Sequence, residues 1–106
     1  MTTAGWVCVH RQLAEHPLWL RERFTPGQAW VDLLLAAAWD DHESFATHGP
    51  SWIKRGQLLT SQMKLASRWR WDRETVRRFL RELERHGMVR IETSKATAIV
   101  RKLLRP

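Results

Sequence analysis

The sequence predicts a small α+β fold that is mainly α-helical and carries a small antiparallel sheet. The chain has 106 residues, enough for one domain, and 43% of them are hydrophobic, which suffices for a buried core. Two helical patterns with recognisable start signals lie over residues 25–40 and 58–87. Two alternating runs of β-forming residues follow over 88–103 and are typical of a hairpin. We therefore expect residues 1–106 to fold as one domain.

Residues 1–24 form an extension ahead of the first long helix. The run 6–10 is rich in β-forming side chains and predicts a short strand. Residues 11–15 have helical composition, and we expect Pro17 to end that helical turn. Apolar side chains recur over 6–20, and we expect this segment to provide the surface of a homodimer.

The first long helix is predicted over 25–40. Thr25 is a favourable N-cap, and Pro26 is tolerated at the first helical position. The helix is apolar on nearly every face, although Asp32 interrupts the longest apolar run, so we expect it to be the buried central helix. A polar loop is expected to follow as far as residues 49–50.

A strand and a short helix are predicted next. Residues 51–59 have a strand composition with a turn or bulge at Gly56. Thr60 or Ser61 then offers a hydroxyl to cap a helix over 62–69. This short helix would brace the helix that follows it, which is the order of a helix-turn-helix.

The longest clear amphipathic helix is predicted over 73–86. Asp72 is its expected N-cap, and Gly87 suits the left-handed position just after its end. Its apolar stripe has the spacing of one helix face and consists of Val76, Phe79, Leu80 and Leu83.

The charge of the chain is strongly divided. Residues 1–50 hold three Lys/Arg and six Asp/Glu, a net charge of −3. Residues 51–106 hold fifteen Lys/Arg and five Asp/Glu, a net charge of +10. A basic half beside a mildly acidic half favours contact with a polyanion on one side of the molecule.

The helix over 73–86 carries long donors on the faces that its apolar stripe leaves free. In a helix-turn-helix the second helix enters the major groove of DNA, and the arginine fork suits both phosphate and the O6/N7 edge of guanine. Arg77 and Arg78 are the most favoured contacts. The full set of predicted DNA-binding residues is Ser61, Arg68, Arg70, Arg73, Glu74, Thr75, Arg77, Arg78, Arg81 and Lys95.

The same helix has a second interpretation. Glu74 and Glu82 each lie four residues from Arg78, so these charges are also consistent with a solvated, salt-bridged face that has no partner.

The residues that recur from the strand at 58 to the hairpin form a known pattern. They are Leu58, Leu59, Thr60, Ser61, Leu65, Ala66, Trp71, Asp72, Arg73, Glu74, Thr75, Val76, Arg77, Arg78, Leu80, Leu83, Gly87 and Val89. This pattern resembles the winged helix-turn-helix superfamily, and MarR-type and GntR-type regulators share it. The resemblance implies that residues 88–103 are the wing, with Lys95, Ser94 and Thr97 toward DNA.

A narrower resemblance involves the N-terminal half. Its residues are Gly5 to Arg11, His16 to Trp19, and Ile53 to Ser61. They are similar to the N-terminal domain of phage replisome-organiser and DnaD-type primosome proteins, with Cys8 where that family usually has a lysine. The resemblance implies that Arg73, Glu74, Thr75, Arg77 and Arg78 face DNA and that Arg81 contacts the DNA backbone.

Other chemistries find little support in the sequence. No paired carboxylates, phosphate-cradling glycine loop or catalytic triad pattern is present, so we expect no enzyme activity and no cofactor. His42 and His48 lack a known metal-ligand spacing, so no metal is expected. Trp69 and Trp71 are interpreted as core residues, with stacking on bases as the alternative.

The sequence therefore predicts a double-stranded DNA-binding protein that acts in phage- or plasmid-type replication initiation or in transcriptional regulation. The alternative is a protein-interaction module, such as a small phage-encoded inhibitor or adaptor, with replication or host proteins as partners. The chain shows no secretory signal or membrane-spanning run, and we expect a cytoplasmic location.

Overall fold

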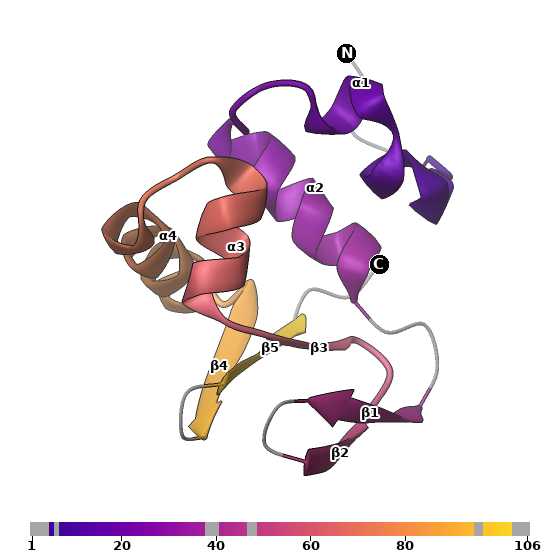
Figure 1. The fold of residues 1–106 in the computed structure, drawn as a ribbon, viewed down its shortest axis with the longest axis vertical. Helices are drawn as coiled ribbons and strands as arrows, with labels where there is room; N and C mark the ends of the chain where they lie inside the picture. The colour runs from indigo at the N-terminus through magenta and orange to yellow at the C-terminus, as the bar shows by residue number, and fades with distance from the viewer. Residues whose placement is uncertain (1–4, 6, 38–40, 47–48, 95–96, 103–106) are drawn as a thin grey trace.

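The computed structural model describes all residues except 1–4, 6, 38–40, 47–48, 95–96 and 103–106. Its helical elements are η1 (Arg11–Glu15, a 3-10 turn), α1 (Pro17–Leu20), α2 (Pro26–Ala36), α3 (Gln62–Trp69) and α4 (Arg73–Arg85). Its strands are β1 (His42–Ala46), β2 (Gly49–Ile53), β3 (Gln57–Thr60), β4 (Val89–Ser94) and β5 (Thr97–Lys102). The helices gather at one end of the molecule and the strands at the other (Figure 1).

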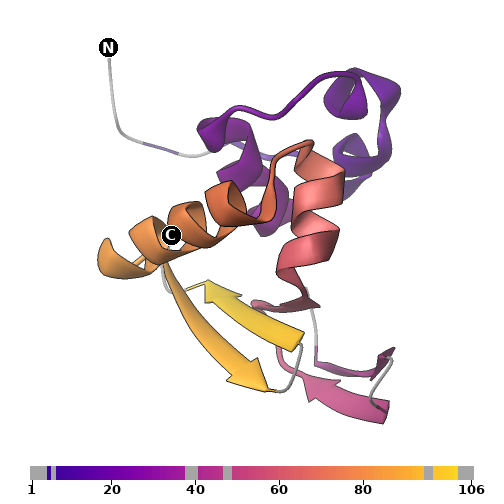
Figure 2. The same cartoon turned by 60° about the vertical axis from the view of Figure 1, so that its left-hand side comes forward.

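The strands form two antiparallel units. β3, β5 and β4 make a three-stranded sheet with β5 in the middle, so that the last strand of the chain lies between two earlier ones. β1 and β2 form a separate hairpin. The β4–β5 hairpin extends away from the end of α4 (Figure 2). The predicted combination of helices with a small antiparallel sheet is confirmed.

Helix α2 begins as predicted and ends earlier. The Thr25 hydroxyl accepts a hydrogen bond from the Gln28 backbone N–H at 3.1 Å, and the helix closes at Ala36. The expectation of burial on nearly every face was wrong: within the helix only Ala29, Asp32 and Leu33 are buried. The helix packs on η1 and on the core with part of its circumference, and its other apolar side chains remain half-exposed.

Three sequence predictions in the first 60 residues are corrected. Residues 7–10 are exposed and belong to no strand of the described chain, since no strand there offers a partner. The expected polar loop before residue 50 contains β1 and the start of β2. The predicted strand over 51–59 is two strands, β2 and β3, divided by the turn that the sequence predicted at Gly56 (φ +86°).

The pair of helices α3 and α4 forms as predicted. Ser61 caps α3 by accepting from the Lys64 N–H at 3.1 Å, and Asp72 caps α4 by accepting from the Thr75 N–H at 2.7 Å. The turn between them passes through Arg70, which has φ +59° and ψ +41°.

Gly87 ends α4 in the left-handed conformation that its position in the sequence predicted. Its φ is +71°, and its N–H donates to the Glu84 carbonyl at 3.0 Å. The next N–H, of Met88, donates to the Leu83 carbonyl at 2.9 Å, which completes a Schellman motif. The motif turns the chain from α4 directly into β4.

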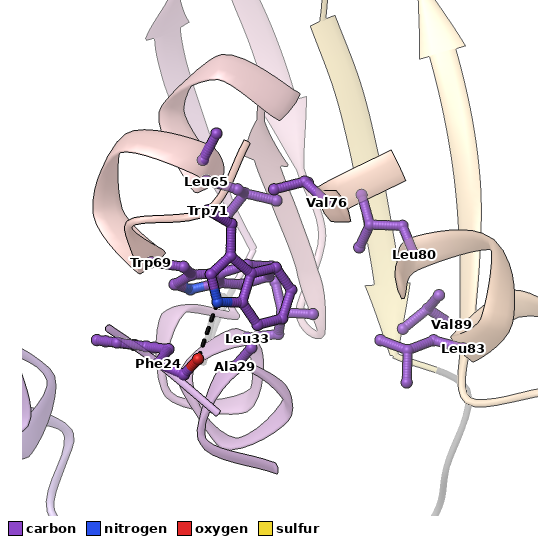
Figure 3. Close-up of a cluster of buried hydrophobic side chains, with 11 residues drawn as sticks. Phe24, Ala29, Leu33, Leu65, Trp69, Trp71, Val76, Leu80, Leu83 and Val89 are labelled. Carbon is purple, nitrogen blue, oxygen red and sulfur yellow. Dashed lines mark hydrogen bonds between the residues drawn. The ribbon is translucent and has the colours of Figure 1, made fainter. Parts of the chain in front are cut away.

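The core brings the apolar stripe of α4 against α2, α3 and the segment before α2 (Figure 3). Trp69 is fully buried and Trp71 is 8% exposed. The Trp71 indole N–H donates to the Phe24 carbonyl at 2.8 Å, and the Phe24 N–H donates to the Trp69 carbonyl at 3.1 Å. Both tryptophans are therefore core residues, as predicted, and their rings are not available for stacking on bases.

Candidate nucleic-acid interface

The two faces of α4 have opposite character. Val76, Leu80 and Leu83 are at most 5% exposed and fix the helix to the core. On the far side, a stripe of charged residues follows the spacing i, i+3, i+4, i+7 and consists of Glu74, Arg77, Arg78 and Arg81. We call these four residues the arginine stripe. Burial of one face thus forces the arginine stripe outward, because residues at this spacing share the opposite side of a helix.

The members of the stripe differ in their partners. Arg77 forms an ion pair with Glu74, in which Nε donates to Oε2 at 3.0 Å and Nη2 donates to Oε1 at 2.5 Å. Within the residues that the structure describes, the exposed Arg78 and Arg81 take part in no ion pair. The stripe therefore offers one guanidinium group that is already held and two that pair with no carboxylate among the described residues.

The charges of the stripe shift the pKa values of Glu74 and Arg77. The hydrogen bond from Arg77 and the positive charges of Arg77, Arg78 and Arg81 hold the pKa of Glu74 below its ordinary value. The same hydrogen bond raises the pKa of Arg77. By formal charge, three arginines and one glutamate give the stripe a net charge of +2.

The N-terminus of α4 is held by its cap. Hydrogen bonds from Thr75 to Asp72 hold the pKa of that carboxyl below its ordinary value, so the cap stays ionised. Arg73 is exposed on the first turn, and Thr75 is half-buried there. The structure thus brings Arg73, Glu74, Thr75, Arg77, Arg78 and Arg81 together on one short helix.

Arg68 does not join this group. Its guanidinium donates through Nε to Asp32 Oδ2 at 2.7 Å, through Nη2 to Asp32 Oδ1 at 2.9 Å, and through Nη2 to the Ala14 carbonyl at 2.6 Å. These three bonds turn the side chain toward α2 and η1. In the fold these bonds give Arg68 a structural role, and its predicted phosphate contact stays a prediction.

The Asp32 carboxylate is the centre of a network that sequence reasoning missed. It also accepts from the Trp19 indole at 3.0 Å and from the Trp69 indole at 2.8 Å, so four donors surround it. Burial raises the pKa of Asp32, but the hydrogen bonds from Arg68, Trp19 and Trp69 outweigh that effect and leave the pKa lowered. A lone acid inside an apolar helical run was the signal for a buried partner.

The remaining predicted contacts lie around α3 and the hairpin. Ser61 is occupied as the cap of α3, and Arg70 is exposed in the turn, where its carbonyl accepts from Arg23 Nε at 3.3 Å. Lys95 lies outside the described residues, between the end of β4 at Ser94 and the start of β5 at Thr97. The predicted contact of Lys95 with DNA therefore stays a prediction.

One contact sets the start of the hairpin relative to α4. The Ile91 N–H of β4 donates to Oε2 of Glu84, the second-to-last residue of α4, at 3.0 Å. Together with the Schellman motif, this bond gives the β4–β5 hairpin a fixed departure from the helix that carries the arginine stripe.

Metal-ligating clusters and membrane-spanning helices were considered for the described residues. No group of three or more His, Cys, Asp or Glu residues is placed to hold a metal ion in the part of the chain that the structure describes. No helix there is long and apolar enough to cross a membrane.

Comparisons of the chain with protein-family models, with curated proteins and with solved structures each found no match.

Proposed function

We propose that this chain is a winged helix-turn-helix domain that binds double-stranded DNA with α4 in the major groove. The order of elements supports the fold: α2, β3, the α3–turn–α4 pair, and then the β4–β5 hairpin, with β5 paired between β3 and β4. In such a domain the second helix of the pair enters the groove, and the hairpin is a wing that flanks it.

The observation that carries the proposal is the arginine stripe. The major groove is about 12 Å wide and admits an α-helix, and its walls are phosphates. A helix that presents free guanidinium groups at i+4 and i+7 can reach those phosphates on one side. Arg78 and Arg81 meet this requirement because the opposite stripe of α4 is buried in the core.

The biological setting is part of the same proposal. A domain of this kind serves either replication initiation of the phage or plasmid type or transcriptional regulation, and both begin with recognition of a duplex site. The basic half of the chain, with its net charge of +10, supports attraction to DNA in either setting.

Fluorescence anisotropy with a labelled random-sequence duplex tests the proposal. The wild type is titrated at several salt concentrations beside the Arg77→Ala/Arg78→Ala variant. Each phosphate contact contributes about 0.9 to the slope of log affinity against log salt, so we expect the variant to lose about one to two units of slope. On a specific site, each lost base contact should weaken binding roughly fivefold to 150-fold.

A matched control separates the stripe from the overall charge. Arg21→Ala/Arg55→Ala removes the same two charges from exposed positions after α1 and in the β2–β3 turn. We expect this variant to keep most of the affinity. Equal losses in the two double variants would show that net charge, and not α4, governs binding.

A protein-interaction module is the second candidate function. Leu18 is 65% exposed and Met63 is 64% exposed, and both border hollows that Leu20 also lines. Such apolar exposure favours a protein partner. Absence of duplex binding at low salt, together with a stable complex in a pull-down, would support this function and contradict DNA binding.

A further inference from the structure

We propose that Arg77 reads a guanine base in the major groove and that Glu74 is the residue that positions it. This inference rests on the proposed function and adds a base preference to it. The juxtaposition that carries it is the side-on ion pair of Glu74 and Arg77 on the outward face of α4.

The ion pair uses only one edge of the guanidinium. An arginine has five N–H groups: one on Nε and two on each terminal nitrogen. Glu74 accepts from Nε and from Nη2, which is the side-on edge. The neighbouring end-on edge, formed by Nη1 and the second hydrogen of Nη2, keeps two parallel N–H donors. Arg77 can therefore stay paired with Glu74 and still bind a second group.

The free edge matches guanine better than any other base. Guanine presents two acceptors, O6 and N7, side by side in the major groove. Adenine presents an acceptor beside the N6 amino donor, and that donor opposes a guanidinium N–H. Cytosine presents an amino donor, and thymine a single acceptor with a methyl group. A guanidinium held in one orientation thus discriminates for guanine.

The position of the pair suits base recognition. Glu74 and Arg77 lie in the first half of α4, near its capped N-terminus at Asp72. The N-terminal residues of a recognition helix are those that contact base edges. The Arg77 side chain is 38% exposed, and its only side-chain hydrogen bonds to described residues are those to Glu74.

In this proposal Glu74 acts as a positioning residue. A carboxylate on a DNA-facing helix repels phosphates and lowers the affinity for duplexes of any sequence. It also holds the flexible Arg77 side chain in the geometry that two parallel hydrogen bonds require. Arg77 then loses less rotamer freedom when it binds. The structure thus assigns specificity to Glu74 and general affinity to Arg78 and Arg81.

The test begins with the preferred site of the wild type, selected from a random-sequence duplex library. Dissociation constants are then measured for this duplex, for the same duplex with each guanine changed in turn, and for an unrelated duplex. The proteins compared are the wild type, Glu74→Gln, Arg77→Ala and the control Glu82→Gln, which removes an exposed acid elsewhere on α4.

The expected result has opposite signs for affinity and specificity. Glu74→Gln should tighten binding to the unrelated duplex about twofold to threefold, because it removes one negative charge. It should also lower discrimination at one guanine by about fivefold or more, and Arg77→Ala, which leaves no donor at this position, should abolish discrimination at that same guanine. Glu82→Gln should tighten binding without changing discrimination.

A modified base identifies the contacted atom. 7-Deazaguanine at the sensitive position removes the N7 acceptor and should weaken wild-type binding about fivefold or more. Arg77→Ala, which has no donor at this position, should respond at most weakly to the same replacement. Equal responses of the two proteins would overturn the assignment of Arg77.

Failure of the inference is distinguishable from failure of DNA binding. If the arginine stripe is needed for binding but no guanine depends on Glu74 and Arg77, the inference is wrong and the proposed function stands. If the Arg77→Ala/Arg78→Ala variant binds duplexes as the wild type does, both are wrong.

Discussion

Two ion pairs of this protein have the same chemistry and different environments. Asp32 and Arg68 join α2 to α3, with an aspartate side chain that is 3% exposed. Glu74 and Arg77 lie on α4, with a glutamate side chain that is 55% exposed. The first carboxylate has four donors from three residues in two helices, α1 and α3, whereas the second is bonded by a single arginine.

The comparison shows that burial decides what an ion pair does. A buried carboxylate without its donors is an uncompensated charge, so its network is needed for folding. An exposed pair contributes little to stability because water and salt screen it. It remains free to orient a side chain toward a ligand. The Asp32 pair therefore belongs to the fold, and the Glu74 pair belongs to the surface.

The largest expected effect is the loss of stability in Asp32→Asn, for which Glu74→Gln is the matched carboxamide control. Asp32→Asn places an amide hydrogen-bond donor among donors, and we expect it to lower the free energy of unfolding by about 3–5 kcal/mol. Glu74→Gln should leave that free energy unchanged within error. Urea denaturation followed by tryptophan fluorescence measures both. Similar losses in the two variants would contradict the division into a buried and a surface pair.

A smaller effect is expected when one donor is removed from the buried network. Trp19→Phe deletes the indole N–H that donates to Asp32 Oδ1, and we expect a loss of about 1.5–3 kcal/mol, typical of a hydrogen bond to a charged group. Trp30→Phe is the control, because Trp30 is also half-buried and its indole N–H donates to no described residue. If the control loses as much as Trp19→Phe, lost packing and not the hydrogen bond is responsible.

The smallest effect concerns pH. The lowered pKa of Asp32 means that its stabilisation is fully present above its ordinary pKa of 3.8 and is lost as the pH falls through the folded-state value below it. The stability of the wild type should therefore decline in acid below about pH 4, and that decline should be reduced in Asp32→Asn. Denaturant titrations between pH 2 and 5, in low and high salt, follow it.

Salt distinguishes the two carboxylates in this experiment. The exposed Glu74 also has a lowered pKa, owing to Arg77, but added salt screens its interactions with the stripe. The part of the acid transition that persists in high salt should thus be the part that Asp32→Asn removes. A transition that high salt abolishes entirely would contradict the role of Asp32.

Much of the helical part was predictable because its signals are local. Thr25, Ser61 and Asp72 are caps whose hydroxyl or carboxylate serves a backbone N–H three residues on, and Gly87 supplies a left-handed residue. The apolar spacing of α4 likewise predicts which face is buried, and hence that Arg77 and Arg78 face solvent. Such features depend on a few neighbouring residues and can be read from the sequence.

The features that could not be predicted from the sequence depend on long-range contacts. Arg68 has the composition of a DNA contact, and only the fold shows that Asp32, 36 residues earlier, occupies its guanidinium. The β1–β2 hairpin was missed because its polar sequence lacks the apolar alternation of a half-buried strand. The strand over 6–10 was predicted from composition, although a strand needs a neighbour that the described fold does not provide there.

The Asp32 network has a consequence for the order in which the protein folds. Its bonds join residues 13, 36 and 37 positions apart, and the Arg68 bond to the Ala14 carbonyl spans 54. Closing such separations costs chain entropy, whereas α3, its turn and α4 are neighbours that can assemble early. We therefore expect the network to form after the rate-limiting step, so that Asp32→Asn accelerates unfolding and leaves the folding rate nearly unchanged. The helix pair that carries the arginine stripe would then be assembled before the N-terminal segment locks onto it.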